Sequence, residues 1–162
     1  MGRWKPPAPK SSPYITPEGY ARLHKEQESL WEKRSEVTEA VSAAAAEGDR
    51  SENAEYIYRK KQLREIDARI RYLQKRLPEL NVVDRVGDES TVRFGAVISL
   101  LCENGNQVEY KIVGADEIDA SGSKISVDSP LAKALIGKRV DDDVSLTLQG
   151  KRIEYCVESI RY

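Results

Sequence analysis

The sequence predicts an α+β protein in two parts, an N-terminal antiparallel coiled-coil hairpin followed by a small C-terminal α+β domain. Two segments on either side of a short glycine-containing turn carry apolar residues at helical spacing. Beyond residue 93 the apolar residues instead alternate or form β-branched runs, which is typical of strands. The chain has 162 residues, of which 40% are hydrophobic, and this is enough for two small domains.

Residues 1–14 are expected to form a flexible, basic, proline-rich leader, because they contain four prolines and no apolar stretch. The segment is therefore not a secretory signal, and no later run approaches the roughly 20 apolar residues of a membrane span. The cysteines Cys102 and Cys156 and the single histidine His24 do not have the spacing of a zinc motif. These observations favour a reduced, cytoplasmic setting without membrane contact.

The first arm of the hairpin is predicted to begin at Thr16, a hydroxyl N-cap, with Pro17 at the first helical position. Gly48 is a C-cap residue that ends this helix. Between these two signals the apolar residues follow a heptad seam: Tyr20, Leu23, Leu30, Val37, Val41 and Ala44.

The second arm continues the same spacing and ends near Pro78, which disfavours helix at the residue before it. Its seam consists of Tyr56, Leu63, Ile66, Ile70, Leu73 and Leu77. Two matching seams joined by a short turn predict a hairpin over residues 15–80, with an acidic tip at residues 48–56. Because the turn favours folding back within one chain, we expect a monomer; a simple coiled-coil adaptor or homodimer is the alternative.

Residues 81–93 are polar and are expected to form a linker before the C-terminal domain at residues 94–162. Four strands are predicted there, at Phe94–Leu101, Val108–Val113, Val144–Leu148 and Ile153–Ile160. One short helix is expected among them, with Asp128 or Ser129 as its cap, Pro130 at its first position and Gly137 just past its end.

The two arms of the hairpin differ in charge. The first arm is mainly acidic, whereas the second is rich in basic residues: Arg59, Lys60, Lys61, Arg64, Arg69, Arg71, Lys75 and Arg76. Solvation and pairing across the hairpin are the ordinary explanation of such charges. The basic surplus also suits contact with a polyanion backbone.

Three carboxylates, Asp49, Glu52 and Glu55, follow one another at intervals of three residues in the tip. If the second helix begins near Ser51, this spacing places them along one side of its first turns. Helix capping and interaction with the helix dipole would explain them without any function. The alternative is a divalent ion between carboxylate and phosphate, since Mg²⁺ commonly takes one or two carboxylates together with substrate phosphates. The tip alone has too few ligands for an independent nuclease, so we expect no cofactor in the free protein.

The chain resembles the Gre-type bacterial transcript cleavage factors, and most closely their GreB branch. The resemblance covers the chain from about Ile15 to its C-terminus and rests on ordered matches in both halves. These are GDRSENAEY (48–56), KQLREID (61–67), IVG (112–114) and SVDSPLAKAL (126–135).

The resemblance implies an FKBP-like fold for the C-terminal domain and a role as an accessory factor rather than an enzyme. It implies that the hairpin enters the secondary channel of RNA polymerase and helps the polymerase active site cleave backtracked nascent RNA. Asp49 would then help to hold a second Mg²⁺ shared with the polymerase, and Glu52 would assist that metal or position the attacking water. Asn53, Glu55 and Tyr56 would support the tip.

The resemblance also implies two contact surfaces. A basic face made of Arg59, Lys60, Lys61 and Arg64 would contact the 3′ segment of the nascent RNA. The loop formed by Asp128, Ser129 and Pro130 would dock on the rim of the polymerase channel, although the sequence alone favours the simpler explanation of a capped helix start.

Two other functions remain open at this point. One is a secondary-channel regulator that changes transcription without cleavage; the intact pair of Asp49 and Glu52 argues against it. The other is a prolyl isomerase, suggested only by the FKBP-like fold. Because aromatic residues are few after residue 80 and fold alone does not imply activity, we expect no isomerase activity.

Overall fold

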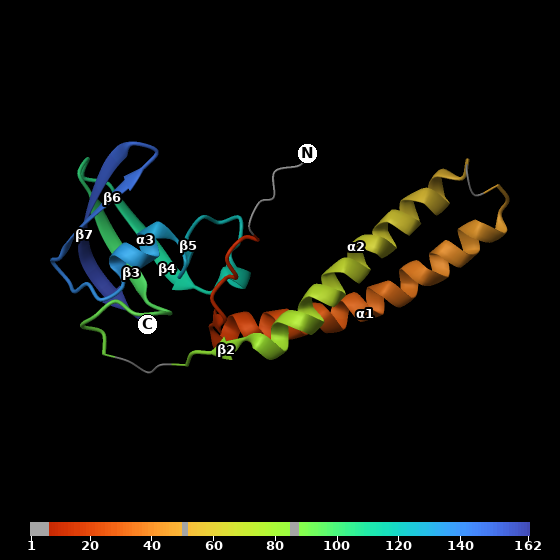
Figure 1. The fold of residues 1–162 in the computed structure, drawn as a ribbon, viewed down its shortest axis with the longest axis horizontal. Helices are drawn as coiled ribbons and strands as arrows, with labels where there is room; N and C mark the ends of the chain where they lie inside the picture. Colours follow the sequence, from red (N-terminus) through yellow and green to blue (C-terminus); the bar gives the residue numbers. More distant parts are fainter. Residues whose placement is uncertain (1–6, 50–51, 85–87) are drawn as a thin grey trace. The chain divides into compact units, whose positions relative to one another are not determined.

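The structure is a computed structural model that describes residues 7–49, 52–84 and 88–162. The chain divides into two compact units (Figure 1). One contains Tyr20–Leu80, and the other contains Asn81–Tyr162 together with the chain up to Gly19. In the part of the chain that the structure describes, no helix has the length and apolar character needed to cross a membrane.

The Tyr20–Leu80 unit is a helical hairpin, as predicted (Figure 1). Helix α1 (Pro17–Ala46) and helix α2 (Ala54–Arg76) are followed by a 3₁₀ turn, η1 (Leu77–Glu79). At a rise of 1.5 Å per residue the helices are about 45 and 35 Å long. The predicted seams are confirmed in the apolar cluster that joins the arms: Leu30, Val37, Val41, Leu63, Ile66 and Ile70.

Two ion pairs also connect the arms. Arg34 Nε lies 2.6 Å from Asp67 Oδ1, and Arg69 donates to both oxygens of Glu26, at 2.6 and 3.0 Å. All four side chains are about two-fifths exposed, so each pair contributes only about 0–1 kcal/mol to stability. Through these pairs, Arg34 of α1 and Arg69 of α2 are neutralised by acidic residues of the opposite helix.

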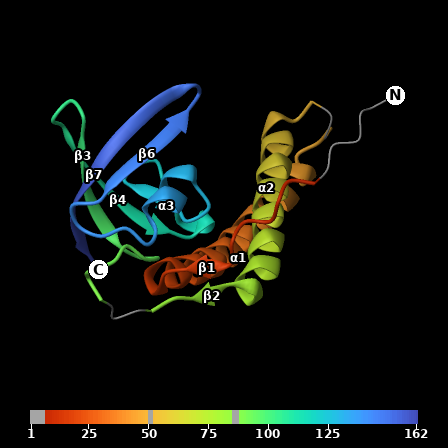
Figure 2. The same cartoon turned by 60° about the vertical axis from the view of Figure 1, so that its left-hand side comes forward.

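The second unit is built on a five-stranded sheet in the order β5-β4-β3-β7-β6. The strands are β3 (Val97–Cys102), β4 (Gln107–Val113), β5 (Lys124–Ser126), β6 (Asp143–Leu148) and β7 (Lys151–Arg161). Neighbouring strands are antiparallel, except that β4 and β5 are parallel. Helix α3 (Pro130–Leu135) packs on one face of this sheet through Ala132 and Leu135 (Figure 2). The α+β architecture and all four predicted strands are confirmed, whereas β5 was not predicted.

A small second sheet changes the boundaries that the sequence predicts. Strand β1 (Tyr14–Ile15) pairs in parallel with β2 (Asn81–Val82), so a strand includes the last residue of the leader predicted over residues 1–14, and another lies in the linker predicted over residues 81–93. Val92, also in the predicted linker, is fully buried in the core of the domain. These boundaries differ because short backbone pairing leaves no periodic pattern of side chains for sequence analysis to detect.

A buried carboxylate holds the first turn of α1 within this same unit. Glu117, at the end of the 3₁₀ turn η2 (Ala115–Glu117), is 3% exposed. One of its oxygens, Oε2, accepts from the backbone amides of Thr16 (3.1 Å) and Gly114 (2.7 Å), and the other, Oε1, accepts from the Thr16 hydroxyl. That hydroxyl oxygen in turn accepts from the amide of Gly19 (3.1 Å), which confirms Thr16 as the N-cap of α1. Glu117 thereby joins the start of the helix to a turn about 100 residues later in the chain.

Candidate functional site

The turn between α1 and α2 is organised by Asn53. Its side-chain oxygen accepts from the amide of Tyr56 at 3.1 Å, which makes Asn53 the N-cap of α2. Its side-chain nitrogen donates to the carbonyl oxygen of Ala44, in the last turn of α1, at 2.8 Å. One amide side chain therefore satisfies a backbone group at the end of each helix, where orphan groups otherwise remain. Gly48, just past α1, has a φ of 135°, a conformation that other residues rarely adopt.

Asp49 and Glu52 are both exposed on this turn, before α2 begins. The sequence-based expectation of a helix start near Ser51 is wrong, because Ala54 is the first residue of α2 and Asn53 has extended angles (φ −83°, ψ 98°). Asp49 and Glu52 therefore do not lie along a helical face, and neither is the N-cap. Ser51 itself, with Arg50, lies outside the described residues.

Glu55 differs from the other two acids of the turn. It lies in the first turn of α2, and its carboxylate accepts from Arg59 Nε at 2.8 Å. Arg59 also donates to Gln62 (3.1 Å) and lies over the ring of Tyr58, 5.6 Å from its centroid. Glu55 is therefore paired with Arg59 within α2, which is compatible with a role in supporting the turn.

The donor set of the turn is suited to part of a Mg²⁺ shell. Mg²⁺ prefers oxygen ligands and usually retains several waters, so two exposed carboxylates can supply a share of its ligands while phosphates supply others. Within residues 7–49, 52–84 and 88–162, no group of three or more His, Cys, Asp or Glu side chains is placed to hold a metal ion. Asp49 and Glu52 alone would supply fewer ligands than Mg²⁺ takes.

Two residues of the predicted basic face, Arg64 and Lys61, line different grooves of the hairpin. Arg64 lines a groove together with Trp31 and Arg71, whereas Lys61 lines a different groove together with Lys33 and Tyr58. On a helix with 3.6 residues per turn, Lys61 and Arg64 point in directions about 60° apart, so they are neighbours on the surface of α2 although they line different grooves. Lys60 points about 40° beyond Arg64 and is half-buried, while Arg59 is partly occupied by Glu55. Trp31 was not predicted to belong to a functional surface, because it follows the seam residue Leu30 and so lies off the seam.

The predicted docking loop has clear structural roles inside its own domain. Ser129 is the N-cap of α3, since its hydroxyl oxygen accepts from the amide of Ala132 at 3.2 Å, and Pro130 is the first helical residue. The carboxylate of Asp128 accepts from the amide of Ser12 at 2.8 Å and from the hydroxyl of Ser12. Of the three residues, Pro130 is the most exposed.

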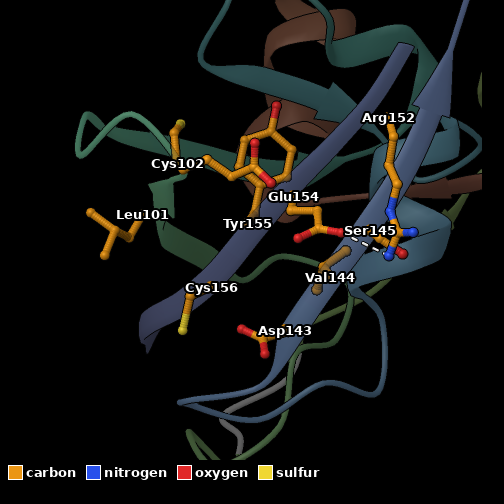
Figure 3. Close-up of a pocket in the computed structure, with 10 residues that line it drawn as sticks. Leu101, Cys102, Asp143, Val144, Ser145, Arg152, Glu154, Tyr155 and Cys156 are labelled. Carbon is orange, nitrogen blue, oxygen red and sulfur yellow. Dashed lines mark ion pairs between the residues drawn. The ribbon is translucent and has the colours of Figure 1, made fainter. Parts of the chain in front are cut away.

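Both cysteines border a pocket of about 480 Å³ on the sheet (Figure 3). In the register of β3 and β7, Cys102 is opposite Tyr155 and Leu101 is opposite Cys156, so the two thiols point to opposite faces of the sheet. Both are free thiols. Burial, with the nearby carboxylate of Asp143 adding to it, raises the pKa of Cys156 above its usual value, which makes this thiol less reactive.

Comparison with known proteins identifies the same family as the sequence motifs do. The family model for the transcription elongation factor N-terminal domain matches residues 13–82, and the model for the GreA/GreB C-terminal domain matches residues 87–162. Among curated relatives, transcription elongation factor GreB of Xanthomonas axonopodis pv. citri is 54% identical over 165 residues, covering 100% of this chain and 98% of the relative. GreB of Pseudomonas aeruginosa is 53% identical, covering 98% of this chain and 96% of the relative.

Solved structures with similarity to the chain include GreA factor homolog 1 of Thermus thermophilus. It is 27% identical, with a TM-score of 0.42, and the match covers 92% of this chain and 98% of that one. The family models together span nearly the whole chain, and the curated relatives match it over its full length. The chain belongs to the GreA/GreB family of transcription elongation factors and is most similar to its GreB branch.

Proposed function

We propose that this elongation factor binds RNA polymerase in the cytoplasm, inserts the end of its hairpin through the secondary channel, and stimulates cleavage of backtracked nascent RNA. Family membership supports a role in elongation. The cleavage role is supported by the turn between α1 and α2, where two exposed carboxylates are placed at the end of a hairpin about 35–45 Å long. The protein would act as a monomer that donates groups to the polymerase active site, not as an enzyme by itself.

The observation that carries this proposal is that capping does not account for Asp49 and Glu52. Acidic residues at the start of a helix are usually explained by capping. Here the N-cap of α2 is Asn53, whose side chain also donates to a carbonyl oxygen of α1. Glu55 is paired with Arg59. Asp49 and Glu52 are exposed carboxylates on a turn in which Asn53 caps α2 and bonds to α1, and a positioned, exposed carboxylate is what a group delivered into another protein's active site requires.

Asp49 and Glu52 would hold the Mg²⁺ shared with the polymerase. When bound there, the ion would supply Lewis-acid stabilisation of the reacting oxygens. Asp49 would contribute a ligand oxygen, and Glu52 would either assist it or accept a hydrogen bond from the attacking water and so orient it. Asn53 would keep both side chains in place by fixing the ends of the two helices.

Two further surfaces complete the proposal. Basic residues of α2, namely Arg59, Lys60, Lys61 and Arg64, would contact the 3′ segment of the nascent RNA through its phosphates. The loop of Asp128, Ser129 and Pro130 would dock on the rim of the channel. Since Asp128 already accepts two hydrogen bonds from Ser12, Pro130 is the member best placed for direct contact.

The test is RNA release from a defined backtracked complex, comparing wild type with the double variant Asp49→Asn and Glu52→Gln at several Mg²⁺ concentrations. We expect stimulated cleavage to fall by about 100-fold or more, the usual range for loss of positioned acid–base and ligand groups. Affinity for the polymerase, measured by competition, should stay within about threefold of wild type.

Glu47→Gln is the matched control, because Glu47 is an exposed carboxylate that lies just outside the turn motif. It should cleave like wild type. A double variant that cleaves normally would refute the proposal. If neither wild type nor variant cleaves but both alter initiation at promoters, the chain is a channel regulator without cleavage activity.

A further inference from the structure

One flank of the hairpin contains a groove from which the roles above use only Arg64. We call it the Trp31 groove; its volume is about 520 Å³, and its lining residues are Trp31, Arg34, Arg64, Asp67, Ile70, Arg71 and Gln74. All of them belong to the Tyr20–Leu80 unit. Ile70, buried in the seam, gives the groove an apolar residue between the two helices.

The charges of the groove are unevenly compensated. Of its three arginines, Arg34 is paired with Asp67 at 2.6 Å. Arg64 and Arg71 are exposed, and among the described residues no acidic side chain lies within 4.0 Å of either. They are seven residues apart, which is two helical turns, so they lie on the same side of α2 about 10 Å apart along its axis.

Trp31 is the aromatic residue of the groove, and 47% of its surface is exposed. The guanidinium of Arg34 lies 6.0 Å from the centroid of its ring. Since Asp67 holds Arg34, this contact helps to fix the orientation of the indole without covering it. A large apolar side chain that remains half-exposed, beside cations that have no acidic partner among the described residues, indicates a binding surface.

We infer that the Trp31 groove binds single-stranded RNA, with a base stacked on the indole of Trp31 and flanking phosphates on Arg64 and Arg71. Aromatic faces combined with cations that follow the backbone are the usual means of binding single strands. This inference rests on the proposed function, because it extends the contact of Arg64 with the nascent RNA to Trp31 and Arg71. Trp31 precedes the end of α1 by 15 residues, so the stacking site would lie about 22 Å from the tip of the hairpin.

The residues of the groove favour single-stranded RNA over two other polyanions. A duplex keeps its base faces stacked inside and would engage only the arginines. An acidic protein segment would likewise pair with the arginines but would have no planar group to place on an exposed indole. Only a single strand presents both phosphates and free base faces.

The inference can be tested with the free protein at low salt by following the anisotropy of a fluorescently labelled, nine-nucleotide single-stranded RNA. Trp31→Leu should weaken binding about 5- to 20-fold, the lower part of the range that follows from losing one stacked base at an open site. Trp31→Phe should retain most of the affinity. Replacement of Arg64 and Arg71 by glutamine should each reduce the dependence of log affinity on log salt by about 0.7.

Tyr72→Leu is the matched control. Tyr72 is another exposed aromatic of the hairpin (42%) that lies beneath an arginine, Arg69 at 5.2 Å, but it does not line the groove. Its replacement should leave RNA affinity unchanged. Helical circular dichroism of each variant should equal that of wild type, since the side chains replaced are exposed.

Fluorescence provides an independent measurement. In a Trp4→Phe background, Trp31 is the remaining tryptophan, and its emission should be quenched by the single-stranded RNA but not by the same RNA annealed to its complement. If poly-glutamate of equal length quenches the emission of Trp31 and competes equally well with the RNA, the occupant of the groove is an acidic protein surface. That result would overturn the inference.

These measurements do not depend on cleavage, so they separate this inference from the proposed function. The Asp49→Asn and Glu52→Gln double variant should bind the RNA like wild type. Trp31→Leu should cleave backtracked RNA at a normal maximal rate but require a higher concentration of the factor. Unchanged RNA affinity in Trp31→Leu would refute the inference even if the tip behaves as proposed.

Discussion

Replacing Glu117 tests the reasoning about how the first turn of α1 is held. In Glu117→Ala the amides of Thr16 and Gly114 lose their acceptor, and both residues are buried. An unsatisfied buried donor costs about 1–3 kcal/mol, so the two amides set a range of about 2–6 kcal/mol. Water can enter the space left by the side chain, and we therefore expect a loss of about 2–4 kcal/mol in the free energy of unfolding. This is a large part of the 5–15 kcal/mol typical of a folded domain.

Glu117→Gln is the informative control, because both amides bond to the same oxygen, Oε2. A glutamine that places its carbonyl at Oε2 keeps both bonds, and its NH₂ group then faces the Thr16 hydroxyl, which can accept. We expect it to cost less than about 1 kcal/mol. Urea unfolding followed by circular dichroism gives the free energies, and hydrogen exchange at the amides of Thr16 and Gly114 reports the local effect. If the glutamine variant is as unstable as the alanine variant, negative charge rather than hydrogen bonding accounts for the effect, and the reasoning is wrong.

Two further predictions concern Asn53 and Asp119. Asn53→Asp keeps the cap of α2 but replaces the donor to the Ala44 carbonyl, so the hairpin should lose about 0.5–1.5 kcal/mol in thermal unfolding; an unchanged melting temperature would contradict the bridging role. The Ser121 hydroxyl, followed by Lys124, lowers the pKa of Asp119 from 3.8 to about 2. A lowered native pKa contributes stability that is present above pH 4 and is lost as the pH falls toward 2. Asp119→Asn should therefore lose less stability than wild type between pH 4 and 2 in acid titrations, and equal losses would exclude a contribution from this carboxylate.

The elements that could be predicted from the sequence are those whose side chains repeat at a regular period. Such patterns occur in the seams of α1 and α2 and in strands β3, β4, β6 and β7. The N-caps Thr16 and Ser129 are each followed by a proline at the first helical position, which is a common helix start. Strand β5 has only three residues, which is too short for alternation to be recognised. Strands β1 and β2 have two residues each and exist because distant backbone segments pair, which no local pattern reports.

The candidate site was predictable in its residue types but not in its local geometry. The spacing of Asp49, Glu52 and Glu55 suits a helix, yet Asn53 begins α2 later because its side chain bonds simultaneously to both arms. Arg64 and Lys61, both expected on one basic face of α2, line different grooves, because each groove also depends on residues of α1 that the pattern of α2 does not report. Trp31 was missed for a different reason: an aromatic residue off the seam is ordinary in sequence, and only its exposure next to Arg64 and Arg71 makes it informative.

The bond between Thr16 and Glu117 has a consequence for the order of folding during synthesis. The partners are 101 residues apart, so the segment around Thr16 leaves the ribosome long before its acceptor is made. At about 5–20 residues per second, the delay is about 5–20 seconds. The hairpin, whose contacts are local, can form during this interval, whereas the first turn of α1 can be joined to the second unit only after the turn Ala115–Glu117 has been synthesised.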